Sequence, residues 1–205
     1  MTLSTEQGFP FWVAFGTIVR GWALAEQGQA EEGIVQIQQG LAAFRAMGTE
    51  MARTGFLPML AAAYAKMGRV EEGLSVLAEA LALVDKTGVR MGEAGLYVLK
   101  GGLTLQKFQV SGSKFQVANP QSLTPNPQAE AEVEVCFQKA IEIARRQSAK
   151  SLELRAVMSL SRLWQLRGKK DEARQLLAEI YGWFTEGFDT KDLQEAKAMM
   201  AELSQ

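Results

Sequence analysis

The stretch RGWALAEQGQAEEGI (Arg20–Ile34) has a near copy forty residues later, LAAAYAKMGRVEEGL (Leu60–Leu74). In both, a small residue is followed by a larger apolar one, then by a glycine, and then by two adjacent glutamates at the same spacing. Glycine suits the left-handed residue that ends a helix, and acidic residues are favoured in the first turn of the next helix. Small residues such as Gly21, Gly33 and Gly40 allow two helices to approach closely. Each stretch therefore predicts a helix, a tight turn and a second helix.

The same layout returns twice more along the chain. The third copy begins near Gly101, and its second half, EVEVCFQKAIEIA, is displaced by an insertion. In the fourth copy, MSLSRLWQLRGKKDEARQLLAEI, Ser161 is the small residue and Gly168 ends the first helix. A fixed period of paired helices is the sign of an α-solenoid. We therefore predict an all-α fold, a right-handed solenoid of about four helix–turn–helix repeats, as a single domain over 1–205.

Helices are expected at 10–27, 30–47, 51–67, 70–86, 89–107, 128–148, 151–167, 170–184 and 190–203. They form repeats near 10–48, 50–88, 89–148 and 150–185, followed by a capping helix at 189–204. Asp189 is the expected N-cap of this last helix, and its apolar side is expected to comprise Leu193, Ala196, Met200 and Leu203. Pro58 falls inside the third helix, where it removes a donor and crowds the carbonyl of Thr54. That helix should therefore start near Gly55 or be kinked.

The insertion reads FQVSGSKFQVANPQSLTPNPQ (Phe108–Gln128) and holds three prolines without a helical pattern. We predict a loop over 108–128 between the two helices of the third repeat. Long structureless loops are usually functional or disordered, and the composition favours disorder. The alternation of Phe108, Val110, Phe115 and Val117 leaves a docking role or a short hairpin as alternatives.

The residue types in the chain argue against catalysis. The sequence has no histidine and one cysteine, Cys136, which excludes histidine-dependent nucleophilic arrangements and the usual zinc sites. Cys136 lies beside Phe137 on an expected packing face, so we predict a buried structural thiol. The paired acids recur at helix starts, where helix capping explains them. We therefore predict a chain that is not an enzyme and takes no cofactor or metal.

The charge and hydropathy of the chain limit its partners and its location. The formal net charge is −1, which predicts neither a nucleic-acid nor a membrane partner. The segment Lys139–Arg174 is richer in basic than in acidic residues, which indicates either a solvated helix face or a basic patch. No apolar stretch approaches the roughly 18 residues that span a bilayer, and the amino-terminal residues lack a signal-peptide pattern. We expect a cytoplasmic location.

Two resemblances to known families follow from these motifs. The spacing of small and apolar residues resembles that of tetratricopeptide repeats (TPRs). The last third, from AIEIARRQ to AMMAEL (140–203), resembles the C-terminal tail of large bacterial multidomain signalling proteins. The stretch from GFPFWVAF to LAAFRAMG (8–48) is similar to the upstream part of that tail, and together the two resemblances cover nearly the whole chain. In that family an adenylate or guanylate cyclase, a kinase or a DNA-binding domain precedes an ATPase of the AAA or STAND kind. The resemblance implies a sensor or scaffold tail that controls those domains.

The TPR resemblance also implies a binding groove, because the first helix of each TPR lines a concave face. Carried onto this sequence, the groove residues are Phe15, Ile18, Trp22, Lys66, Val98, Leu105, Arg155, Met158 and Arg162. Such a groove would be apolar at one end and cationic at the other, and it would suit an amphipathic helix or a peptide with an acidic end. For Phe15 and Trp22 the alternative is packing against neighbouring repeats.

Three functions remain open on these grounds. The first is a non-catalytic, regulatory module that binds a protein or peptide, including upstream domains of the same polypeptide. The second is homo-oligomerisation, such as a homodimer, through an uncapped aromatic face that comprises Phe9, Phe11 and Trp12. The alternative for that face is that upstream repeats or another domain cover it. The third is the sensing of a small ligand in the groove, as in STAND-type regulators.

Overall fold

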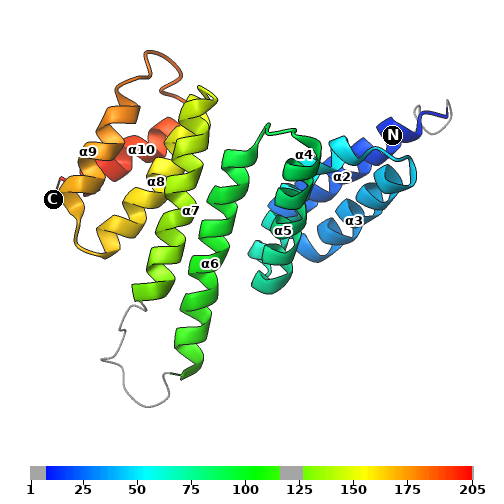
Figure 1. Cartoon of the computed structure of the whole chain (residues 1–205), viewed down its shortest axis with the longest axis horizontal. Coiled ribbons are helices and arrows are strands. Elements are labelled where there is room, and N and C mark those ends of the chain that lie inside the picture. The colour runs from blue at the N-terminus through cyan, green and yellow to red at the C-terminus, as the bar shows by residue number, and fades with distance from the viewer. Residues whose placement is uncertain (1–7, 116–126, 205) are drawn as a thin grey trace. The chain divides into compact units, whose positions relative to one another are not determined.

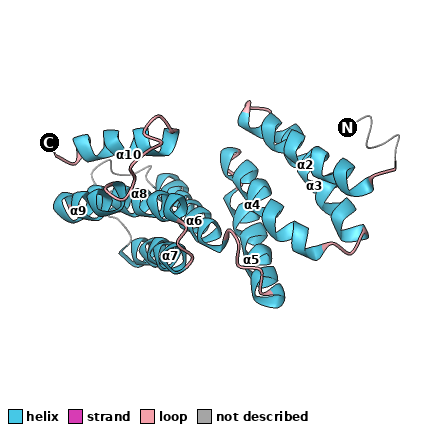
Figure 2. Ribbon diagram, turned by 90° about the horizontal axis from the view of Figure 1, so that it is seen from above, coloured by secondary structure: helices cyan, strands magenta, loops and turns pink. Residues whose placement is uncertain are grey.

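The computed structural model describes residues 8–115 and 127–204, and within these ranges the chain forms nine helices and no strand (Figures 1 and 2). The helices are α2 (Pro10–Glu26), α3 (Ala30–Ala46), α4 (Glu50–Lys66), α5 (Val70–Thr87), α6 (Glu93–Phe115), α7 (Pro127–Arg146), α8 (Lys150–Leu166), α9 (Lys170–Tyr181) and α10 (Lys191–Glu202). The prediction of an all-α fold is confirmed. None of the helices in the described ranges combines the length and the apolar character needed to cross a membrane.

The chain divides into two compact units, Met1–Gly92 and Glu93–Gln205. In unit 1, α2 pairs with α3 and α4 pairs with α5, and α3 also packs against α4 (Figure 1). In unit 2, α6 pairs with α7 and α8 with α9, α7 packs against α8, and α10 packs on α8 and α9. Within each unit, helix pairs are therefore stacked one upon the next. That residues 1–205 form one superhelical domain stays a prediction.

Left-handed residues end most of the helices. They include Gly28, Gly48, Gly68, Gly88 and Gly168, whose φ angles lie between 68° and 88°. After Gly28, the amide of Gln29 donates to the carbonyl of Leu24 at 2.9 Å, which satisfies a carbonyl that the helix end leaves unpaired. Ser148 takes the same role with a φ of 54°. The turns thus recur at twenty-residue spacing, and the predicted helix-ending role of Gly28, Gly68 and Gly168 is confirmed.

The backbones of α2 and α3 are in direct contact at glycines. A Cβ atom added to Gly21 would lie 2.6 Å from the carbonyl oxygen of Gly33, and one added to Gly33 would lie 2.5 Å from the carbonyl oxygen of Gly21. A Cβ atom on Gly40 would lie 2.4 Å from Cγ1 of Ile18. The predicted close approach at these three glycines is confirmed, and it fixes α2 against α3.

Helix α4 passes through its proline. It begins at Glu50 and includes Pro58 in its interior, so a start near Gly55 is wrong, and a kink at Pro58 stays a prediction. Thr54, whose carbonyl faces the proline ring, is buried, and its hydroxyl has no hydrogen-bond partner among the described residues. Tertiary packing on both sides of α4 outweighs the cost of the proline.

The insertion is partly helical. Helix α6 begins at Glu93 and continues to Phe115, so the prediction of a loop or hairpin is wrong for residues 108–115, which include Phe108 and Val110. Extending a helix that is already nucleated costs little per residue, even through Ser and Gly, and no proline lies between Glu93 and Pro120. The rest of the predicted loop, with Val117, falls mainly in 116–126, outside the described residues.

The last helix buries one apolar side, as predicted. Its buried residues are Leu193, Ala196 and Met199, followed by Leu203 at its end, whereas Met200, which the sequence placed on this side, is only half-buried. The helix starts one residue later than expected, because Thr190 and not Asp189 precedes it. The hydroxyl of Thr190 donates to the carbonyl of Gly187 at 2.7 Å and does not cap the helix.

Candidate interaction surfaces

The residues that could carry chemistry are dispersed or buried. Within residues 8–115 and 127–204, no group of three or more His, Cys, Asp or Glu side chains could hold a metal ion. Cys136 is buried, as predicted, and burial raises the pKa of its thiol above the ordinary value. A neutral, buried thiol is a poor nucleophile. The surfaces of the two units are therefore more informative than any cluster of catalytic side chains.

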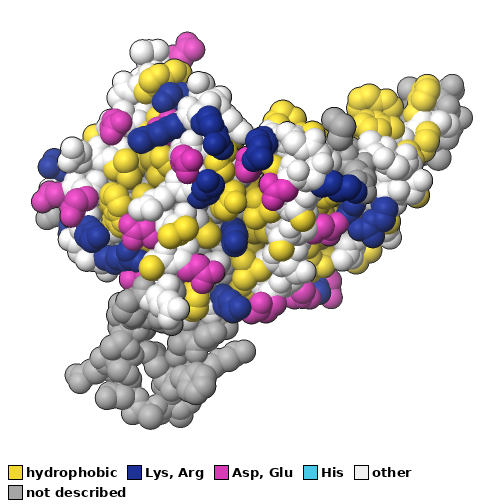
Figure 3. Space-filling view, in the orientation of Figure 1, with side chains coloured by type: hydrophobic (Ala, Val, Ile, Leu, Met, Phe, Trp, Pro, Cys, Tyr) yellow, Lys and Arg dark blue, Asp and Glu magenta, His cyan; other side chains and the backbone are white. Residues whose placement is uncertain are grey.

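Unit 1 carries an exposed aromatic face on α2, made of Phe9, Phe11, Trp12, Phe15 and Trp22, all of which are exposed. The rings of Phe11 and Trp12 meet edge to face at 5.4 Å between centroids, and those of Trp12 and Phe15 at 5.8 Å. Hydrophobic side chains gather around the amino-terminal end of α2 in Figure 3. The predicted groove residue Phe15 and the predicted self-association residues Phe11 and Trp12 thus belong to one continuous surface.

One buried and one half-buried aromatic ring hold this aromatic face in place. Phe44 of α3 is fully buried and stacks on Phe56 of α4, with 5.5 Å between centroids and 4° between planes. Phe11 contacts Phe44 at 5.1 Å, and Phe15 contacts Phe56 at 5.6 Å. Edge-to-face and offset contacts of this kind are favourable beyond the area that they bury. The outer rings therefore stand on a rigid base, which lowers the entropy lost on binding.

The other predicted groove residues of unit 1 differ in accessibility. Trp22 lies two helical turns beyond Phe15 on the same side of α2 and is 40% exposed. Lys66 of α4 forms an ion pair with Glu26 of α2 at 2.7 Å, so its charge is already balanced. Ile18 is 0% exposed and meets α3 at Gly40. The prediction for Ile18 is corrected on this point, because a fully buried side chain cannot contact a partner.

The predicted groove residues of α6 and α8 mostly support the core of unit 2. Val98 and Leu105 are half-buried and pack against a buried cluster that includes Phe137 and Leu160. Met158 belongs to that cluster and is only 3% exposed. The prediction for Met158 is therefore corrected in the same way as that for Ile18. Both residues lie on the inward side of a first helix, where adjacent helices cover them.

The two predicted groove arginines are exposed but paired. Arg155 Nε donates to Asp192 Oδ2 at 2.6 Å, and Arg162 Nη2 lies 3.4 Å from Glu195 Oε2. Both carboxylates come from α10, so the capping helix balances the positive charge that was expected to make this end of the groove cationic. Acidic and basic side chains are interspersed over unit 2 in Figure 3. Exposed pairs of this kind contribute little stability, but they make the surface of α8 a charge-balanced one.

A polar network between α7 and α8 was not foreseen from the sequence. Trp164 Nε1 donates to Glu134 Oε1 at 2.9 Å, Arg167 Nε donates to Glu130 Oε2 at 2.7 Å, and Arg167 also pairs with Glu134. Burial raises the pKa of Glu134, but hydrogen bonds from Trp164 and Arg167 outweigh it, so the pKa lies below the usual value. The network occupies Trp164 and leaves it unavailable as a binding aromatic.

No protein-family model and no curated protein matches the chain. Solved structures do match it. Nearly identical TPR-like repeats of a kinesin light chain of Podosopora anserina, in a point variant, superpose with a TM-score of 0.63 at 17% identity, over 95% of this chain and 85% of that chain. A second structure of these repeats gives a TM-score of 0.60 at 17% identity, over 95% and 86% of the two chains. The fold is TPR-like.

The TPR-like fold explains which predicted residues the structure brings together. Phe15 and Trp22 share one side of the first helix of a pair and remain exposed. Ile18 and Met158 lie where a TPR-like first helix packs on its neighbours, and Val98 and Leu105 are half covered. At this level of identity the likeness concerns the fold alone. The aromatic face of α2 holds most of the exposed aromatic side chains of the described residues, the others being Trp183 and Phe188.

Proposed function

We propose that this chain is a non-catalytic protein-interaction module whose aromatic face on α2 binds a peptide or an amphipathic helix. The observation that supports this function most directly is the exposure of Trp12 and Trp22, at 57% and 40%, on one side of α2. Tryptophan and other aromatic residues supply most of the energy in protein interfaces. Contiguous apolar surface on a folded chain typically marks an interaction site.

The aromatic face suits a partner with apolar residues at helical spacing. The rings of Trp12, Phe15 and Trp22 lie along about three turns of α2, and the ion pair between Glu26 and Lys66 stands at the far end. A partner helix with apolar residues at i, i+3 and i+10, which also lie on one side of a helix, would place one side chain against each ring. A polar residue at its end would meet Glu26 and Lys66, which would fix its direction.

In the cell, this module would act as the regulatory C-terminal tail of a larger bacterial signalling protein of the cyclase or ATPase type, located in the cytoplasm. The support is the resemblance of residues 140–203 and 8–48 to such tails. The partner is then a separate protein or an upstream domain of the same polypeptide.

Homo-oligomerisation is a second candidate, because the same surface is uncharged. Phe9, Phe11 and Trp12 are 53%, 39% and 57% exposed, and an uncharged face meets its own copy without like-charge repulsion. A homodimer would bury these rings symmetrically. The molecular mass in solution distinguishes the candidates, because Trp12→Glu would lower the mass of a dimer and would not change that of a monomer.

The test of the main proposal is a pull-down from a lysate of the source organism, read by mass spectrometry. Wild type is compared with Trp22→Glu and with Trp183→Glu, a matched change at an exposed tryptophan of unit 2. Circular dichroism first establishes that all three chains are folded. A protein retained by wild type and Trp183→Glu but lost by Trp22→Glu supports the proposal. Identical retention by all three chains, or recovery of the chain alone, counts against it.

A further inference from the structure

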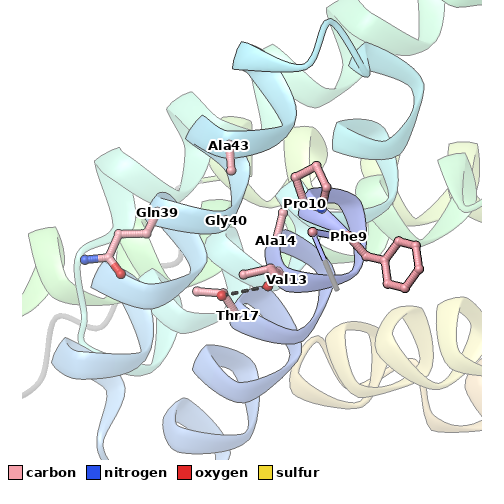
Figure 4. A pocket seen from close by; sticks show the side chains of 9 residues that line it. Phe9, Pro10, Val13, Ala14, Thr17, Gln39, Gly40 and Ala43 are labelled. Atoms are coloured by element: carbon pink, nitrogen blue, oxygen red, sulfur yellow. Dashed lines mark hydrogen bonds between the residues drawn. The ribbon is translucent and has the colours of Figure 1, made fainter. Parts of the chain in front are cut away.

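A hollow of about 430 Å³ lies on the outer side of the first helix pair (Figure 4). Val13 and Thr17 of α2 and Gln39 and Ala43 of α3 line it, with Gly40 between them, while the ring of Phe9 points away. Val13 and Thr17 are half-buried, and among the described residues that line the hollow none is charged. Val13 is nine residues from Trp22, so the hollow lies on the opposite side of α2 from Trp22.

The second helix pair shows what covers the equivalent face. Forty residues on, Val13, Thr17 and Gln39 correspond to Arg53, Leu57 and Glu79. There the preceding helix α3 packs against α4, and Arg53 and Leu57 are only 5% and 2% exposed. Glu79 forms one ion pair with Arg45 of α3, at 3.4 Å, and a second ion pair with Arg53. On this face α3 also places Gln38, whose amide donates to the hydroxyl of Tyr64 at 2.8 Å.

The fourth helix pair repeats the arrangement. Its equivalent residues are Glu153, Val157 and Glu179, and Glu153 and Val157 are 3% and 0% exposed. The preceding helix α7 packs against α8, and its Arg145, which corresponds to Arg45, bonds to Glu153 at 2.7 Å and lies 3.7 Å from Glu179. On both covered faces, therefore, the second helix of the preceding pair contributes an arginine that pairs with a glutamate.

The first helix pair has the same face with the charges removed. Val13 stands where the other two pairs have a buried charged residue, and Gln39 stands where they have a glutamate. An arginine brought onto this face would lose its solvation without gaining a carboxylate. The face thus retains the shape that receives a helix, but it selects a helix without that arginine.

We propose that the hollow between α2 and α3 is a docking site for an amphipathic helix of a partner protein, which lies there as α3 lies on α4, where Arg45 of α3 reaches Glu79 of α5. Its docking side is apolar where Leu41 and Phe44 stand in α3, and it carries an uncharged residue where Arg45 stands. This site is separate from the aromatic side of α2 that Trp22 marks, so either proposal can fail without the other.

The experiment uses the full chain and two fluorescein-labelled, hydrocarbon-stapled peptides. One has the sequence of α3 (Ala30–Ala46), and the other has the same sequence with Arg45→Gln. Fluorescence polarisation should show saturable binding of the Arg45→Gln peptide to wild type. Val13→Glu should weaken this binding at least about ten-fold, because the carboxylate would be covered without a partner. Trp183→Glu, at an exposed position of unit 2, should not change it.

A change of charge at Gln39 distinguishes docking in this orientation from non-specific binding. Gln39→Glu recreates the glutamate of the covered faces, so it should shift preference toward the Arg45-containing peptide by roughly two- to five-fold, the usual strength of an exposed ion pair. Gln194→Glu, a matched change at an exposed residue of α10, should leave the preference unchanged. The same shift for both variants would overturn the proposed orientation.

Other outcomes would overturn the docking site itself. Absence of binding by the Arg45→Gln peptide, or unchanged binding to a folded Val13→Glu variant, would refute it. If the chain were a dimer that Val13→Glu converts to a monomer and that neither peptide disrupts, the occupant would be a second copy of the chain, and the partner helix would be ruled out.

Discussion

The contact between α2 and α3 makes one glycine unusually sensitive to a single methyl group. Gly21→Ala would place Cβ 2.6 Å from the carbonyl oxygen of Gly33, 2.9 Å from the amide nitrogen of Ile37 and 2.9 Å from Cβ of Gln36. Two of these atoms belong to the backbone of α3 and cannot rotate away. Atoms in ordinary contact stay about 3.5 Å apart, so α3 would have to move by roughly 1 Å.

Two opposing effects decide the magnitude. Alanine in a helix interior is favoured over glycine by about 1 kcal/mol, whereas overpacking in a close contact typically costs about 1–3 kcal/mol. Because backbone, not a flexible side chain, opposes the methyl group, we expect the upper part of that range. The free energy of unfolding should fall by about 1–2 kcal/mol, which lowers the melting temperature of a domain the size of unit 1 by roughly 4–15 °C.

The assay is urea unfolding followed by circular dichroism, with Gly55→Ala as the matched control. Gly55 is an exposed position in α4 of the same unit, and a Cβ atom there meets no described atom within 4 Å. The control should therefore gain stability from helix propensity alone, by about 0.5–1 kcal/mol. If Gly21→Ala were as stable as Gly55→Ala, the close approach of α2 and α3 would be refuted.

Three further predictions concern unit 2. Leu177→Ala removes a side chain that is 0% exposed and should cost about 2–5 kcal/mol in urea unfolding, whereas Leu166→Ala, at a position 74% exposed, should stay within about 0.5 kcal/mol of wild type. The pKa of Glu134 lies below the usual 4.5 in the folded chain, so its stabilising effect is complete above the unfolded pKa and is lost as the pH falls through the folded one. The stability advantage of wild type over Glu134→Gln should accordingly shrink between about pH 6 and pH 3, and an advantage that does not change with pH would contradict the network with Trp164 and Arg167. Cys136 should react with Ellman's reagent slowly at pH 8 and rapidly in urea, because its raised pKa and its burial suppress the thiolate; equal rates would show that the thiol is accessible in the folded chain.

The sequence predicted the repeating part of the fold because each turn is marked by residues that lie close to it in the sequence. Glycine at Gly28, Gly68 and Gly168 and the acids that follow Gly28 and Gly168 mark a helix end and a helix start within a few residues. The insertion was harder to predict. Helix α6 runs to Phe115 because stopping an established helix requires a definite signal, which Ser111 and Gly112 do not supply.

The sequence predicted which residues share the side of the helix that forms the candidate surface, but not how deeply each side chain is buried. A helical pattern shows which residues share a side of a helix, and this was enough to place Phe15 and Trp22 together. It does not show how far the neighbouring helix reaches round that side, so Ile18 and Met158 were assigned to the groove although both are buried. The partners of Arg155 and Arg162 lie more than thirty residues away on α10, and no local pattern indicates such a pairing.

The twenty-residue recurrence of left-handed turns gives the chain a natural unit of length. A duplication or deletion of forty residues between two such turns, for example between Gly28 and Gly68, would exchange whole helix pairs and would keep every first helix a first helix. A change of twenty residues would instead convert all later first helices into second ones, and the small residues that meet across a pair would face the wrong neighbour. Insertions and deletions in this chain should therefore preserve the packing when they span forty residues, which is one whole helix pair, and disrupt it when they span twenty.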